Sequence, residues 1–119
     1  MGLQVESGDR ILRFVFTSAT PARDIYAVFH RAFAEAPRDD QVVIDLRAST
    51  SLGDRTPEFV RMITEFIVLH PERPGERMAV LLPPEEVERW KKLAADVDME
   101  GVEIGLFEDI DDAETWALA

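Results

Sequence analysis

The residues of this sequence best suited to chemistry follow an apolar run, VVID, at residues 42–45. Asp45 and Arg47 supply a carboxylate and a guanidinium, and residues 49–51 add hydroxyl groups. A hydroxyl becomes a nucleophile only when a base lies close by. The sequence has no nucleophile elbow and no evident base partner, so turn hydrogen bonds explain these hydroxyls better. We therefore expect no catalytic residue and no enzymatic activity.

Asp45 is the acid of most interest, because it ends a run typical of a strand that is buried on both faces. A buried carboxylate needs a partner, and either Arg47 or Arg55 could provide one. The interpretation we favour is a structural ion pair. A functional carboxylate is the alternative.

A second group of acids near the end of the sequence could suggest a metal site: Glu108, Asp109, Asp111 and Asp112. The spacing of a calcium-binding loop is absent. Acids are also favoured at the N-terminus of a helix, and Asp111 followed by Glu114 resembles a capping box. We expect helix capping here and no metal.

The charge and composition exclude several classes of function. The chain has 13 lysine and arginine residues against 24 aspartate and glutamate residues, a net charge of −11. This charge repels phosphate backbones, so we expect no nucleic-acid partner. Cysteine is absent, which fits a cytoplasmic protein. No apolar run reaches the roughly 18 residues of a membrane span, and no glycine-rich loop indicates a cofactor.

The spacing of apolar residues predicts the elements that must position these groups. Residues 3–6 and 10–17 are typical of two strands joined by a tight turn, in which Gly8 can take a positive φ. Thr20-Pro21 predicts a helix start with a hydroxyl N-cap and proline in the first helical position. The apolar stripe of this helix is Ile25, Val28, Phe29, Ala32, Phe33 and Ala36.

Further strands are predicted at residues 42–46, 78–82 and 102–107, with helix starts at Thr56-Pro57 and Pro83-Pro84 and a short final helix. The order β-β-α-β-α-β-α-β-α predicts one α/β domain over residues 1–119. It has a five-stranded, mostly parallel sheet, an N-terminal β-hairpin and about four helices. The edge strands near Leu3 and Val102 could pair with another copy, so monomer and homodimer both stay open.

Three features of the sequence carry a family resemblance: the opening hairpin, VVIDLR at residues 42–47, and the ending VEIGLFEDIDDAETWAL at residues 102–118. Together with the element order, they resemble the STAS domain, the fold of bacterial anti-sigma-factor antagonists. Within that family the chain looks most like the SpoIIAA-like group, also described as STAS/SEC14-like. The resemblance covers nearly the whole chain.

The resemblance implies a protein-binding surface in the loop after the third strand and at the start of the second helix. In antagonists this strand ends in Asp-Leu, and a serine in a following Asp-Ser-x-Gly motif is phosphorylated by a partner kinase. Here Asp45-Leu46 is present, but the phosphoacceptor position falls near Asp54, where no serine stands. The candidate binding residues are Asp45, Arg47, Ser49, Ser51, Asp54, Arg55 and Thr56. Thr56 is the candidate phosphoacceptor, although a hydroxyl before Pro57 also suits an N-cap.

The SEC14-like aspect of the resemblance implies an apolar pocket between sheet and helices. Its candidate lining residues are Phe29, Phe33, Phe59, Phe66 and Trp90. Aromatic residues at helical spacing are also the usual content of a core. We therefore expect a non-enzymatic domain that engages a regulatory protein partner, with a carrier of a lipid or other small apolar ligand as the alternative.

Overall fold

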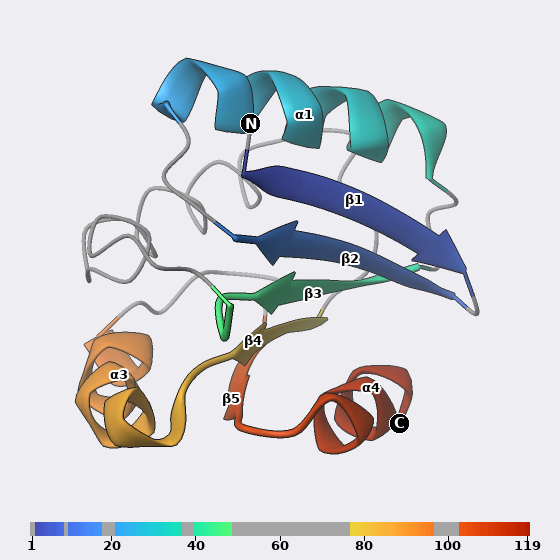
Figure 1. Ribbon diagram of the computed structural model, residues 1–119. Coiled ribbons are helices and arrows are strands. Elements are labelled where there is room, and N and C mark those ends of the chain that lie inside the picture. The colour runs from blue at the N-terminus through green and yellow to red at the C-terminus, as the bar shows by residue number, and fades with distance from the viewer. Residues whose placement is uncertain (1, 9, 18–20, 37–39, 49–76, 97–102) are drawn as a thin grey trace.

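The computed structural model describes residues 2–8, 10–17, 21–36, 40–48, 77–96 and 103–119. The strands in this part of the chain are β1 (Leu3–Gly8), β2 (Ile11–Phe16), β3 (Gln41–Asp45), β4 (Arg77–Leu81) and β5 (Glu103–Phe107). The helices are α1 (Ala22–Glu35), α3 (Pro84–Asp96) and α4 (Ile110–Leu118) (Figure 1). The helix predicted to start at Pro57 lies outside the described residues.

The strands form one sheet in the order β1-β2-β3-β4-β5. β1 pairs with β2 in antiparallel orientation, and each later pair of neighbours is parallel. The register places Val15 beside Asp45, and Asp45 beside Leu81. This arrangement confirms the predicted five-stranded, mostly parallel sheet with its antiparallel hairpin, and β1 and β5 are its edges.

One face of the sheet packs against α1 and α3. Alternate residues of each strand point to this face and form a buried cluster with the two helices. Phe14 of β2 stacks on Phe29 of α1 with ring centroids 3.9 Å apart. Val87 and Trp90 of α3 belong to the same buried cluster. The other strand residues of this cluster include Leu12, Phe16, Val42, Ile44, Met78 and Val80.

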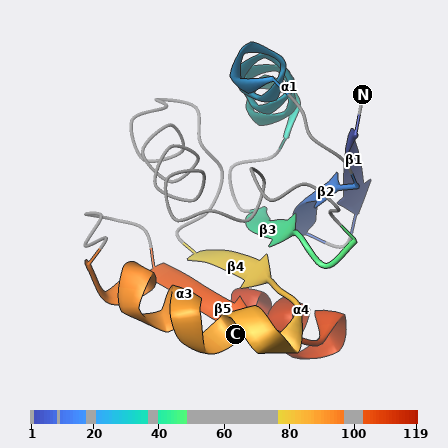
Figure 2. The ribbon, with the colours of Figure 1, turned by 60° about the vertical axis from the view of Figure 1, so that its left-hand side comes forward.

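The opposite face of the sheet packs against α4. Ala113 and Ala117 of this helix lie against a second buried cluster that contains Val43, Ala79 and Leu81. Figure 2 shows α1 and α4 on opposite sides of the sheet. The layers are therefore helix, sheet and helix, which is the architecture expected for strands that alternate with helices.

The hairpin turn and two helix starts differ in detail from the prediction. Arg10, not Gly8, has the left-handed conformation, with φ of 66°. Pro21 is the N-cap of α1 and not its first helical residue. Asp109 is the N-cap of α4, where its carboxylate accepts from the N–H groups of Asp111 and Asp112 at 2.8 and 3.3 Å. The predicted capping box starting at Asp111 is therefore wrong by two residues, since Asp109 already satisfies those donors.

Arg77 at the start of β4 fixes the other end of α4. Its Nη1 donates to the carbonyl oxygens of Trp116 and Ala119 at 2.7 and 3.1 Å. The guanidinium carbon lies 5.3 Å from the centre of the Trp116 ring, within the range of a cation–π contact. Since the last turn of α4 has no basic residue of its own, Arg77 supplies the cation that the helix dipole favours there.

Candidate functional site

The carboxyl ends of the parallel strands lie together at one edge of the sheet. Asp45, Leu81 and Phe107 end β3, β4 and β5 in register. The ladder continues one residue further, with Leu46 N–H donating to Leu81 O and Leu82 N–H to Phe107 O, both at 2.9 Å. The segments that follow these strands therefore leave the sheet side by side. In open α/β sheets this edge is where binding sites form.

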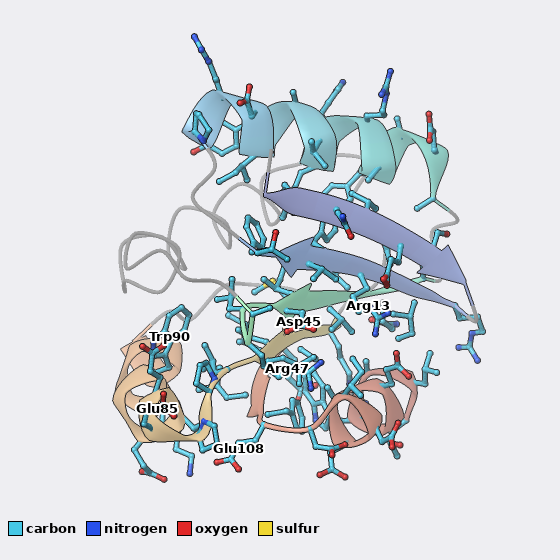
Figure 3. The ribbon with its side chains drawn as sticks, in the orientation of Figure 1. Arg13, Asp45, Arg47, Glu85, Trp90 and Glu108 are labelled. Atoms are coloured by element: carbon cyan, nitrogen blue, oxygen red, sulfur yellow. The ribbon has the colours of Figure 1, made fainter. Side chains whose placement is uncertain are left out.

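A two-point ion pair between Asp45 and Arg47 occupies this edge (Figure 3). Arg47 Nε donates to Asp45 Oδ1 at 3.1 Å, and Arg47 Nη2 donates to Oδ2 at 2.9 Å. The backbone N–H of Arg47 donates to Oδ1 as well, at 3.0 Å. The Asp45 side chain is 9% exposed and that of Arg47 is 37% exposed. Arg47 is thus the partner that the buried carboxylate was predicted to need.

The charges around this pair hold Arg47 in its protonated form. Its hydrogen bond to Asp45 raises the pKa of Arg47, and the nearby charge of Asp109 acts in the same direction. Arg47 therefore cannot serve as a base, and both carboxylate oxygens of Asp45 already accept from it. The arrangement is suited to holding a turn and presenting a guanidinium.

Lys91 lies on α3, the helix that packs against the same face of the sheet as α1, and forms a further charged contact. Its ammonium donates to Glu88 at 2.8 Å, and this hydrogen bond raises the pKa of Lys91. The charge of Glu108, which follows β5, also raises it. The end of β5 therefore interacts with Arg47 through Asp109 and with Lys91 through Glu108, so this edge carries charges of both signs.

The other predicted binding residues could not be compared with the structure. Ser49, Ser51, Asp54, Arg55 and Thr56 all lie in residues 49–76, outside the described residues, and so the loop and its candidate phosphoacceptor stay predictions. Within the loop's described beginning, the structure brings Asp45 and Arg47 together. Ala48, the next residue, is exposed.

Of the aromatic residues predicted to line a pocket, some lie within the described residues and some outside them. Phe29, Phe33 and Trp90 are buried, with exposed fractions of 0–1%. The rings of Phe29 and Phe33 lie 5.8 Å apart, and both contact Phe14. Phe59 and Phe66 lie outside the described residues. The three described side chains are core residues, and a ligand pocket beside them stays a prediction.

The sequence reasoning overlooked the part that Asp109 plays at this edge. Asp109 caps α4 and also adds to the charge around Arg47. The parallel topology was the signal that could have revealed this proximity, because the ends of β3 and β5 must meet at the same edge of the sheet.

Two further observations concern the part of the chain that the structure describes. No three histidine, aspartate or glutamate side chains gather there in a way that could hold a metal ion. None of its helices is both long enough and apolar enough to cross a membrane.

The fold has close counterparts among solved structures, although the sequence matches no family model and no curated protein. An anti-sigma factor antagonist from Mycobacterium paratuberculosis superimposes with a TM-score of 0.66 and 19% identity, over 98% of this chain and 93% of that one. An uncharacterized protein with a SpoIIAA-like fold from Shewanella loihica superimposes with a TM-score of 0.61 and 19% identity, over 97% of this chain and 91% of that one. The chain has the STAS, SpoIIAA-like fold.

The shared STAS fold confirms the architecture that the sequence resemblance implied. The match extends over nearly all of both chains, so the hairpin, the sheet and the last helix all belong to it. At this low identity, what the match shows is the course of the backbone. The roles of individual side chains follow from this chain's own contacts.

Proposed function

We propose that this domain is a non-enzymatic regulatory module that binds a protein partner at the carboxyl edge of its sheet. The binding surface comprises the Asp45–Arg47 turn, exposed Ala48 and the loop that continues through Ser49, Ser51, Asp54, Arg55 and Thr56. The observation that carries the proposal is the two-point ion pair at the end of the buried strand β3.

The ion pair supports a binding role because it fixes the direction in which the chain leaves the sheet. Three hydrogen bonds from Arg47 to one carboxylate hold this turn, while 37% of the Arg47 side chain stays accessible. A surface that is ordered before binding loses less conformational entropy when a partner docks. Both carboxylate oxygens of Asp45 are engaged by Arg47, which favours recognition over an enzymatic reaction.

The class of partner follows from the similarity to an anti-sigma factor antagonist. By analogy with that protein, the proposed partner is a regulatory protein of the anti-sigma-factor type. Thr56 is the proposed phosphoacceptor of this surface. Phosphopeptide mass spectrometry of the protein from its source cells, under several growth conditions, tests that assignment.

Partner capture with a blocking variant tests the binding surface. Ala48→Arg places a long side chain on the exposed residue beside the ion pair without removing any hydrogen bond of the pair. We expect it to weaken partner binding at least about tenfold, which is roughly 1.4 kcal/mol. The matched control is Arg23→Glu, at an 89% exposed side chain on α1. Its binding should equal that of the wild type, and unchanged thermal unfolding of both variants should confirm their fold.

Unchanged capture by the Ala48→Arg variant would count against this surface. Cross-linking mass spectrometry of the complex gives a second measure, because cross-links should involve Lys91, whose pKa the charge of Glu108 after β5 helps to raise. Cross-links confined to the amino group at the start of the chain, with none from Lys91, would place the partner elsewhere.

The alternative function, transport of a small apolar ligand, has weaker support. Phe29 and Phe33 pack against Phe14 in the core, so core packing already explains these rings. Native mass spectrometry before and after solvent extraction tests this alternative, followed by binding assays with a panel of lipids. A bound mass that extraction removes would favour the carrier function.

A further inference from the structure

A groove runs between the edge strand β1 and helix α1, on the α1 side of the sheet. Its volume is about 810 Å³, and it opens to solvent. Leu3, Val5 and Ser7 of β1 line one wall, and Val28, Arg31 and Glu35 of α1 line the other. Val5 is 39% exposed, and it is the one large apolar side chain of the described residues with such exposure.

Among the residues that the structure describes, the backbone of β1 has no hydrogen-bonding partner along the outer side of this groove. Thr17 N–H donates to Gly2 O at 2.7 Å, so the backbone groups of Gly2 point toward β2. Along an antiparallel strand, the N–H and C=O groups of successive residues point alternately toward and away from the neighbouring strand. The backbone groups of Leu3, Val5 and Ser7 therefore point away from β2. The usual protection of an edge is absent, because β1 has neither proline nor lysine. Its single charge, Glu6, is paired with Arg13.

We propose that a second copy of this chain occupies the groove, with the two β1 strands paired antiparallel about a two-fold axis at Val5. In this register Val5 lies opposite Val5, Leu3 opposite Ser7, and Gln4 opposite Glu6. The outward backbone groups of all three groove-facing residues find partners, and no two like charges face each other directly. The strand is therefore complementary to itself, which is what a two-fold interface requires.

The charges on α1 support the same occupant. Arg31 and Glu35 stand one turn apart, both are exposed, and both line the groove. Within the described part of the chain, neither forms an ion pair. The two-fold axis reverses the second α1 relative to the first, and the proposed dimer places Arg31 of each copy opposite Glu35 of the other. A strand from an unrelated protein could use the backbone edge, but this exchange of charges is specific to a second copy.

This interface goes beyond the proposed function and leaves the proposed partner surface free. β1 is the outermost strand of the sheet, and β2 separates it from β3, which carries Asp45. The result is one continuous ten-stranded sheet with two copies of the carboxyl-edge surface. The dimer and the regulatory partner can therefore be tested separately.

Disulfide trapping tests the register, because the chain has no cysteine of its own. A Val5→Cys variant places two thiols opposite each other across the axis, at a spacing that suits a disulfide. Oxidised glutathione should convert it to a covalent dimer. Ser7→Cys is the matched control on the same strand and face. Its two thiols would lie about 13 Å apart, four residues along the strand, beyond disulfide reach. Equal cross-linking of both variants would overturn the register.

Charge exchange on α1 tests the identity of the occupant. Arg31→Glu should weaken dimerisation at least about tenfold by opposing two glutamates, and Glu35→Arg should do the same by opposing two arginines. An equimolar mixture of the two variants restores both opposite-charge pairs and should dimerise as the wild type does. Arg23→Glu, elsewhere on α1, should leave the dimer unchanged.

Sedimentation equilibrium at physiological ionic strength gives the masses, at concentrations up to roughly 100 μM to include a weak interface. A monomeric wild type at the highest concentration would overturn the proposal. A dimer that survives both single substitutions and is not improved by mixing would also overturn it.

Discussion

Arg47 holds the Asp45 carboxylate at two points, with Nε 3.1 Å from Oδ1 and Nη2 2.9 Å from Oδ2. The two residues are separated by Leu46 alone, which is fully buried. The chain therefore leaves the sheet with the Leu46 side chain in the core and the Asp45 and Arg47 side chains paired with each other. This geometry satisfies a carboxylate that would otherwise be unfavourable at the end of a buried strand.

The first prediction concerns the stability of this turn. Arg47→Ala leaves the Asp45 carboxylate with few partners, and we expect a loss of about 1–3 kcal/mol in the free energy of unfolding. The partial exposure of Arg47 keeps the loss below that of a fully buried pair. Urea denaturation measures it. Combining Arg47→Ala with Asp45→Asn should cost less than the two changes summed, and strict additivity would show that the pair is not coupled.

The second prediction concerns the N-cap of α4. Asp109→Ala should lower the free energy of unfolding by about 1 kcal/mol, because two backbone N–H groups lose their acceptor. Asp111→Ala is the control, since Asp111 is exposed and its backbone, not its side chain, takes part in the cap. Its effect should be smaller, and a larger effect at Asp111 would return the capping box to that position.

The third prediction concerns two glycines in opposite surroundings. A Cβ at Gly105 would lie 2.7 Å from Cε2 of Phe107 and 3.1 Å from Cη2 of Trp116, two rings that already contact each other. Gly105→Ala should therefore destabilise the protein by roughly 1–3 kcal/mol. A Cβ at Gly8 would meet nothing within 4 Å. Thermal unfolding of Gly8→Ala should match the wild type or exceed it slightly.

The fourth prediction concerns the strained residue of the hairpin turn. Arg10 has φ of 66°, and its carbonyl accepts from Gln41 N–H at 2.9 Å, so the conformation is tied to β3. Arg10→Gly removes the Cβ and keeps that hydrogen bond, and we expect a gain of up to about 1 kcal/mol. Arg23→Gly, within α1, should instead destabilise the protein. Calorimetry that finds the same loss for both would show that Arg10 is unstrained.

The fifth prediction concerns the pH dependence of Lys91. Glu88 and Glu108 raise its pKa in the folded protein. The stability that the charged Lys91 contributes is thus fully present below the pKa of Lys91 in the unfolded chain. It is lost as the pH rises through the pKa of Lys91 in the folded protein. NMR titration of the lysine side chains should show Glu88→Gln lowering the pKa of Lys91. An unaltered titration in that variant would contradict the assignment of Glu88 as the main cause.

Much of the fold could be predicted because the relevant signals are local. The run VVID indicated a strand buried on both faces, and Val42, Val43 and Ile44 are all buried in β3. The stripe through Ile25, Phe29 and Phe33 indicated the buried side of α1. In both cases burial depends on a period that can be read along a few residues of sequence.

The details that were missed depend on contacts between distant segments. Nothing near Arg77 in the sequence indicates that it binds the last carbonyl groups of α4, some 40 residues later. The position of the cap was also ambiguous, because Asp109, Asp111 and Asp112 all suit a helix start. Asp109 is the N-cap, because its backbone is extended and its side chain accepts from the first N–H groups of the helix. The partner loop was inferred from resemblance and stays a prediction, whereas the expected ion pair of Asp45 with a nearby arginine is confirmed at Arg47.

The order of the sheet has a consequence for synthesis of the chain on the ribosome. Each strand lies beside the strand made just before it, so the sheet can grow by adding one strand at a time as the polypeptide emerges. The apolar face formed by Val43, Ala79 and Leu81 is covered by α4, which follows all five strands in the sequence. Until residues 110–118 have been translated, the nascent chain exposes this face, and that is the stage at which a chaperone would protect it best.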